Sequence, residues 1–218
     1  MSDVPVLYED ERVLLVDKPA GRLVIPGRGA GEPPALVEEL SARLGRKLFV
    51  VHRLDRETSG ALAFAKDAPA HRELSGLFAA HRVAKAYLAA VQGSWDRRRV
   101  LEQPLGTFGS GRCGVRADGK PSRTDAAPVE LFGGRASLVQ VEPKTGRRHQ
   151  VRVHLFAAGH PILGDPLYGK PEEWSRRAPR LMLHAWRLEF SLAGKRLRVQ
   201  APLPADFESF LSELRSGK

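Results

Sequence analysis

At residues 50–60 the chain reads VVHRLDRETSG, a cluster of charge between two apolar runs. The runs at 48–51 and 61–65 are short and continuous, which predicts two buried strands. A connection that only turned the chain would use Gly, Pro, Asn or Ser. Loops held between strands are favoured places for reactive groups. The stretch therefore predicts a functional loop, and its ionisable residues are His52, Arg53, Asp55, Arg56 and Glu57.

Asp55 is the centre of this cluster because it lies between Arg53 and Arg56. Neighbouring cations favour the ionised form of a carboxylate. An ionised carboxylate is a poor general acid, but it suits a nucleophile, a base or a counter-ion to developing positive charge. The alternative is a surface loop whose charges neutralise one another and add little stability. The pattern alone leaves both interpretations open.

The bulk composition is that of a globular protein. The 218 residues are 42% hydrophobic, and no apolar run approaches the ~20 residues that a membrane span needs. The N-terminus lacks a secretory signal, so we expect a cytoplasmic protein with no membrane partner. Cys113 is the single cysteine, which excludes an internal disulfide and a cysteine-rich zinc cluster. The histidines lack ligand spacing, so no metal site is predicted.

The net charge of +10 favours a polyanionic partner. Nucleic acid is the first candidate, because arginine suits phosphate and arginine pairs or triplets occur at 97–99, 147–148 and 176–177. The alternative is a chain from an arginine-rich proteome. The clusters weaken that alternative without removing it.

Hydrophobic periodicity predicts interspersed strands and helices without regular alternation, hence an α+β fold with a mixed, largely antiparallel sheet. We expect one domain over residues 1–218. Residues 102–123 are rich in Gly and charge and are expected to be a long loop. Besides the two strands above, strands are expected at 13–16, 85–91, 124–131, 136–141, 181–190 and 197–199, and helices at 34–44, from 67 onward, at 147–158 and at 207–214.

Two further residues have open interpretations. Tyr87 shares a predicted strand face with Ala89 and Val91, so it is either core packing or an aromatic platform for a nucleobase. Arg152 lies at the margin of a predicted helical stripe, where it either reaches water or needs a buried anion. Asp55 is the candidate anion.

Several ordered motifs resemble the RluA family of RNA pseudouridine synthases. The loop at 52–60 is similar to that family's catalytic signature, with Asp55 on its aspartate. The resemblance covers about residues 7–203, and several motifs in order are far more specific than one. The other matching segments are 17–21, 85–87, 145–155, 159–165 and 181–185.

The resemblance implies an isomerase that converts uridine in structured RNA to pseudouridine, without metal or cofactor. It implies one catalytic domain with a cleft across its sheet. The target nucleotide would be flipped out of the RNA, as in other enzymes that act on a base. By resemblance, Asp55, Tyr87 and Arg152 are catalytic, with Tyr87 stacking on the base and Arg152 pairing with Asp55. The expected RNA-binding residues are His52, Arg53, Leu54, Arg148, His149 and Leu183.

The family implies an rRNA or tRNA substrate, and we expect a monomer without an obligate protein partner. About six residues precede the region of resemblance, so we expect no S4 RNA-binding domain. One alternative is a non-catalytic RNA-binding or chaperone protein on the same scaffold. A carboxylate-dependent glycosidase would need a paired acid, and Glu57 lies too near Asp55 in sequence to separate the two roles.

Overall fold

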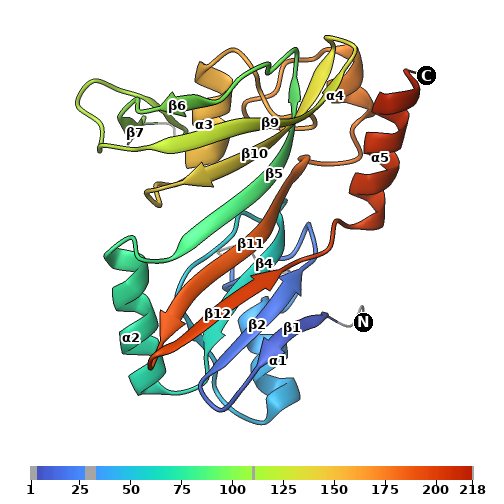
Figure 1. Ribbon diagram of the computed structural model, residues 1–218. Helices are drawn as coiled ribbons and strands as arrows, with labels where there is room; N and C mark the ends of the chain where they lie inside the picture. Colours follow the sequence, from blue (N-terminus) through green and yellow to red (C-terminus); the bar gives the residue numbers. More distant parts are fainter. Residues whose placement is uncertain (1–3, 28–32, 110, 218) are drawn as a thin grey trace. The chain divides into compact units, whose positions relative to one another are not determined.

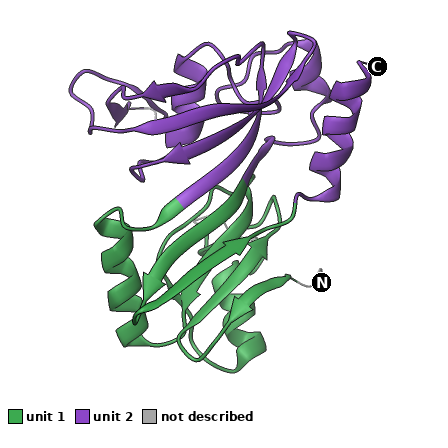
Figure 2. Cartoon of the chain, viewed as in Figure 1, with its two compact units in different colours: residues 1–84, 185–202 green, residues 85–184, 203–218 purple. Residues whose placement is uncertain are grey.

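The computed structural model describes residues 4–27, 33–109 and 111–217. It contains two compact units, shown in Figure 2. Unit 1 comprises residues 1–84 and 185–202, and unit 2 comprises residues 85–184 and 203–218. Among the described helices, none is long and apolar enough to cross a lipid bilayer.

Unit 1 is built on strands in the order β1-β2-β4-β11 (Figure 1). The pairs β1–β2, β2–β4, β3–β4 and β11–β12 are antiparallel. The predicted strands at 13–16, 48–51 and 61–65 are confirmed, while β1 was missed because four residues carry little periodicity. The strands are β1 (Val6–Glu9), β2 (Val13–Lys18), β3 (Phe49–Val50), β4 (Ser59–Ala65), β11 (Leu183–Leu192, of which residues 185–192 lie in this unit) and β12 (Lys195–Gln200).

The central strands β2 and β4 are buried on both faces, which explains their continuous apolar sequences. One face packs against α2 (Ala68–Ala79) through Leu74, with β11 and β12 completing the cluster. The helix begins where expected, because the Asp67 side chain accepts a hydrogen bond from Ala70 N at 2.7 Å. The other predicted helix of this unit is α1 (Leu36–Leu44), which buries Leu36 and Leu40.

Strand β2 ends in two charged residues at the centre of the unit. Asp17 pairs in register with Ala61, and Lys18 pairs with Gly60. Gly60 has φ +115, and a β-carbon there would lie 2.3 Å from the Ala185 carbonyl oxygen. Glycine is therefore required where the chain enters β4 from the loop that precedes it. We call this loop, which carries Asp55, the signature loop.

Unit 2 contains the strand order β5-β10-β9-β6 and a separate hairpin, β7–β8. The predicted strands at 85–91, 124–131 and 136–141 are confirmed, and their pairs are antiparallel. The strands are β5 (Ala84–Gln92), β6 (Arg99–Leu101), β7 (Leu105–Thr107), β8 (Cys113–Val115), β9 (Thr124–Phe132) and β10 (Ala136–Pro143).

Three helices belong to unit 2. Helix α3 (Gln150–Ala157) contacts β8, β9 and β10. Helix α4 (Glu173–Arg177) was not predicted, because a single turn gives no periodicity. Helix α5 (Ala205–Ser216) confirms the predicted C-terminal helix and buries Phe207, Phe210, Leu211 and Leu214.

One sequence prediction in this unit was wrong, and one predicted helix is confirmed with a later start. Residues 102–123 are not a plain loop, since they contain the β7–β8 hairpin, whose glycines hid its alternation. The helix expected from residue 147 begins at Gln150, because His149 adopts the left-handed conformation with φ 54. Its residues 150–155 are all buried, so its side chains do not form one simple stripe.

Asp17 generates a stability prediction. Burial raises its pKa from 3.8 to about 6, and its Oδ1 atom accepts no hydrogen bond from the described residues. Because the folded pKa exceeds the unfolded one, the stability contributed by this carboxyl group is fully present below pH 4 and is lost as the pH rises through about 6. Asp17→Asn should therefore raise the Tm at pH 7.5 by about 2–4 °C. Thermal unfolding would show this gain shrinking towards zero at pH 4; an equal gain at both pH values would contradict the assignment.

Candidate active site

The signature loop joins β3 to β4 and presents its residues in alternate directions. Leu54 is buried, Arg53 and Arg56 are exposed, and Asp55 is half-buried. The Thr58 N–H donates to the Asp55 carbonyl at 3.1 Å and closes a turn. The predicted charged loop between strands is confirmed. Its backbone anchors Leu54 inside the unit and holds the Asp55 carboxylate at the margin of the core.

Lys18 binds the backbone of the signature loop through its side chain. Its side chain has no exposed surface, and its Nζ donates to the carbonyls of Pro19 at 3.0 Å, Arg56 at 2.8 Å and Thr58 at 2.7 Å. Gly21 N–H also donates to the Arg56 carbonyl at 2.9 Å. A buried ammonium is tolerated only when its donors are satisfied. The 17–21 motif is therefore the structural support of the Asp55 loop.

Lys18 was missed as a site residue by sequence analysis. The available signal was a lysine that ends an apolar strand immediately before Pro19, but that pattern does not reveal which backbone the ammonium binds. Carbonyl oxygens leave no trace in the side-chain sequence, so only the fold identifies them.

His52 is held within unit 1. Its Nε2 accepts a hydrogen bond from Ala63 N at 3.0 Å, so that nitrogen carries no proton. Its ring also stacks on Phe78, with centroids 4.4 Å apart. These contacts give His52 an anchoring role, and its expected contact with RNA stays a prediction.

Tyr87 lies half-buried on β5, where it pairs in register with Val141. Lys85 precedes it by two residues and therefore shares its strand face. The Lys85 Nζ donates to the Thr145 carbonyl at 3.1 Å, and burial lowers its pKa to about 8. Sequence analysis missed this lysine, which adds a partly desolvated cation beside the predicted catalytic tyrosine.

Arg152 points inward, as one of its two predicted alternatives required. Its Nε donates to Asp165 Oδ2 at 2.8 Å, and its Nη2 donates to Asp165 Oδ1 at 2.7 Å. Both side chains are almost fully buried, so this is a bidentate ion pair in the interior of unit 2. Asp165 also accepts from Leu167 N and Tyr168 N, which fixes the carboxylate.

Asp165 was missed as a partner because it follows α3 in a separate loop. It supplies an anion that the buried Arg152 requires, and removing either partner of such a pair typically costs about 3–5 kcal/mol. Arg152 and Asp55 belong to different units, and their pairing stays a prediction.

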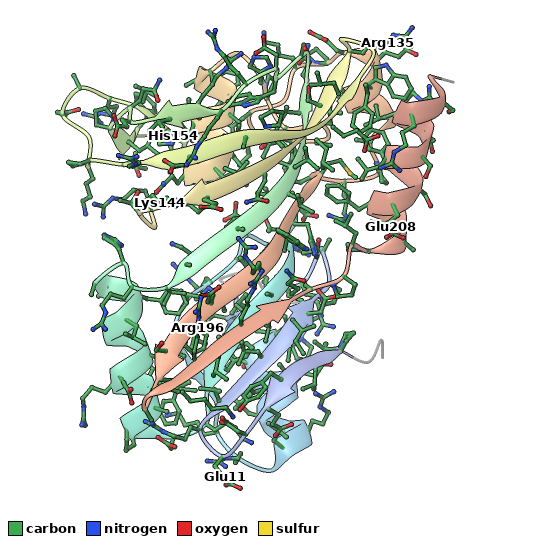
Figure 3. The ribbon with its side chains drawn as sticks, in the orientation of Figure 1. Glu11, Arg135, Lys144, His154, Arg196 and Glu208 are labelled. Carbon is green, nitrogen blue, oxygen red and sulfur yellow. The ribbon has the colours of Figure 1, made fainter. Side chains whose placement is uncertain are left out.

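The loop before α3 is ordered by a network of side chains. Gln150 Oε1 accepts from Thr145 Oγ1 and Arg147 N, while its Nε2 donates to the Arg123 carbonyl and Thr124 Oγ1. His154, labelled in Figure 3, also contacts Thr124 Oγ1 at 2.8 Å, and burial lowers the pKa of its imidazole. Of the arginines beside this network, Arg148 is exposed and Arg147 is half-buried.

The remaining predicted RNA-binding residues of unit 2 have different surroundings. Arg148 is exposed and His149 is half-buried, with His149 Nδ1 3.0 Å from the Tyr168 hydroxyl. Leu183 is only 3% exposed, so it belongs to the core of the unit. Contact of these residues with RNA stays a prediction.

Comparisons of this sequence with known proteins all find similarity to pseudouridine synthases. A family model described as RNA pseudouridylate synthase matches residues 12–157. Ribosomal large subunit pseudouridine synthase D of Nitrosomonas europaea is 36% identical over 97% of this chain. Synthase C of Vibrio cholerae is 39% identical over 96%, and that of Escherichia coli is 38% identical over 100%. The matched regions span 65%, 69% and 72% of these relatives.

Solved structures give the same result. The chain is similar to human RNA pseudouridylate synthase domain containing 1, with a TM-score of 0.80, 28% identity and coverage of 98% of this chain and 95% of that one. Human RNA pseudouridylate synthase domain containing 4 gives a TM-score of 0.79, 26% identity and coverage of 97% and 93%. The α+β prediction is thereby confirmed, and the chain belongs to the RNA pseudouridylate synthase family, in the RluA branch whose motifs its sequence resembles.

Proposed function

We propose that this chain is an RNA pseudouridine synthase in which Asp55 is the essential catalytic group. The observation that carries the proposal is the loop geometry: Lys18 binds the carbonyls on both sides of residue 57 and thereby fixes the backbone that bears Asp55. A fully buried lysine held by three carbonyls is a costly arrangement for an ordinary surface loop. It suits a loop whose carboxylate must meet a substrate in one position.

In the proposed reaction, the N1–C1′ bond of uridine breaks and the bonding electrons leave with uracil. The uracil turns, C5 bonds to C1′, and the C5 proton is released while N1 gains one. Asp55 acts at the sugar or the base as nucleophile or base. Tyr87 stacks on the flipped uracil and assists removal of the C5 proton. Arg152 pairs with Asp55 and orients its carboxylate.

The substrate we propose is RNA of the large ribosomal subunit. The curated relatives reported above are named ribosomal large subunit pseudouridine synthases. The excess of positive charge supports an RNA partner for this chain. Each of the two units contributes exposed arginines to this excess, such as Arg53 in unit 1 and Arg148 in unit 2.

Asp55→Asn should abolish turnover. The amide keeps the shape of the side chain but cannot act as nucleophile or base, so we expect a loss of at least about 10³-fold in tritium release from RNA that contains 5-³H-uridine. Glu57→Gln is the matched control, because it removes a carboxylate two residues away on the same loop and should keep activity within a few-fold. Full activity of a folded Asp55→Asn protein would remove Asp55 from the mechanism, whereas RNA binding without tritium release by the unaltered protein would favour the non-catalytic RNA-binding alternative.

Tyr87→Phe separates stacking from proton transfer. The phenyl ring still stacks on a base, so RNA affinity should stay within about threefold, while turnover falls by at least about 10²-fold. Affinity is measured by fluorescence anisotropy and turnover by single-turnover tritium release at saturating enzyme. Equal losses of affinity and turnover would show that the hydroxyl serves binding and not the proton transfer.

A further inference from the structure

The β7–β8 hairpin of unit 2 has two different faces. Leu105 pairs with Val115, Gly106 with Gly114 and Thr107 with Cys113. Paired residues of an antiparallel ladder point to the same side, and successive pairs alternate. Leu105 and Cys113 are buried with Val153 and Tyr168, so the glycine pair faces away from this core.

On the outer face, two side chains lie directly against the backbone of these glycines, and Phe108 meets Gly114 with one edge of its ring. A β-carbon on Gly114 would sit 2.5 Å from the ring of Phe108, and one on Gly106 would sit 2.8 Å from Cδ of Arg116. Side chains this close to the backbone fit only because both of these residues are glycine. Phe108 and Arg116 thus cross the hairpin in opposite directions, each over the opposite strand.

The resulting platform is both fixed and open. Arg116 donates to both carboxylate oxygens of Asp118, at 2.8 and 2.6 Å, and to the Thr107 carbonyl at 3.0 Å. Its guanidinium lies 5.6 Å from the centroid of the Phe108 ring. The ring nevertheless remains 46% exposed. An aromatic ring held at one edge by the backbone and otherwise this exposed has open ring surface on which a second flat group can stack.

Contacts on the inner face of the hairpin connect this platform to Arg152, the arginine predicted to be catalytic. Cys113 N donates to the Tyr168 hydroxyl at 3.3 Å, and Arg112 Nη2 donates to the Leu167 carbonyl at 2.6 Å. The Tyr168 ring in turn lies 5.2 Å from the Arg152 guanidinium. Within unit 2, the hairpin is therefore joined through one aromatic residue to the Arg152–Asp165 pair.

The positive charge of the surrounding segments indicates which kind of ligand the outer face of the hairpin binds. Residues 97–123 contain seven Lys and Arg against two Asp and Glu, so half of the chain's net charge of +10 lies in 27 residues. Residues 144–152 add four cations and no acid. This second segment meets the first where Arg147 Nε donates to the Pro121 carbonyl at 3.2 Å. Exposed aromatic groups interspersed with cations are the features that bind single-stranded nucleic acid.

We propose that Phe108, supported by Gly114 and flanked by Arg116, is a stacking platform for an unpaired nucleobase of the RNA. This inference rests on the proposed function and adds a binding site for a base other than the target uridine. The flat ring accepts any base, while the surrounding cations bind the phosphates on either side.

Phe108→Ala tests the platform. We expect it to weaken binding of a fluorescein-labelled single-stranded RNA 12-mer by about 5- to 150-fold, the range that corresponds to loss of one base–aromatic stack. Phe108→Trp should bind within about threefold of the parent, and its indole fluorescence should be quenched by the RNA. Val129→Ala is the matched control, because Val129 is 53% exposed on β9 and should have no effect.

Gly114→Val provides a second variant that displaces the ring without deleting it, and it should weaken binding as Phe108→Ala does. Binding is also measured in the Asp55→Asn background, where the same loss is expected because stacking does not require turnover.

Unchanged affinity in Phe108→Ala would overturn the platform even if the parent protein releases tritium. A parent without tritium release would refute the proposed function and leave the binding result standing. If Phe108→Ala instead dissociated a dimer in sedimentation velocity with RNA affinity unchanged, the face would belong to a second copy and the proposal would fail.

Discussion

The hydrogen bonds from Lys18 are the interaction on which the proposed site depends most. Its ammonium joins the end of β2 to the loop that carries Asp55, because it binds the carbonyls of Pro19, Arg56 and Thr58 together. The lysine is wholly buried, so its charge cannot be screened by water and is met by the dipoles around it. The 17–21 and 52–60 motifs are far apart in sequence, but they form one structural element.

In unit 2, the predicted catalytic side chain Arg152 is also fixed by bonds to its charged group, here from a carboxylate instead of carbonyls. Arg152 is clamped by both oxygens of Asp165, and two backbone N–H groups hold that carboxylate in turn. A guanidinium with two bonds already fixed loses little further entropy when it meets another partner. Pre-organisation of this kind lowers the cost of positioning a reacting group. Each unit thus supports one predicted catalytic group: bonds from Lys18 fix the backbone next to Asp55, and Asp165 fixes the guanidinium of Arg152.

Most strands were predicted from the sequence, as were the two helices of unit 1 and the C-terminal helix. Their hydrophobic periodicity follows directly from burial. The motifs also pointed to Asp55, Tyr87 and Arg152. The sequence did not reveal Asp165, because its contact with Arg152 joins separate segments. It did not reveal the carbonyls around Lys18 either, because no side-chain pattern records backbone atoms. The β7–β8 hairpin was missed for a related reason. Its outer positions are glycines, and their function depends on Phe108 and Arg116, which lie across the opposite strand.

The central claim is that this chain makes pseudouridine through the carboxylate of Asp55. Its most direct test is a pseudouridine map of cellular RNA from three strains: one that lacks the protein, one that expresses it, and one that expresses Asp55→Asn at the same level. We predict that one or a few uridines of the large-subunit RNA are modified only when the unaltered protein is present. A map that is identical in all three strains, or full modification by Asp55→Asn, would contradict this account.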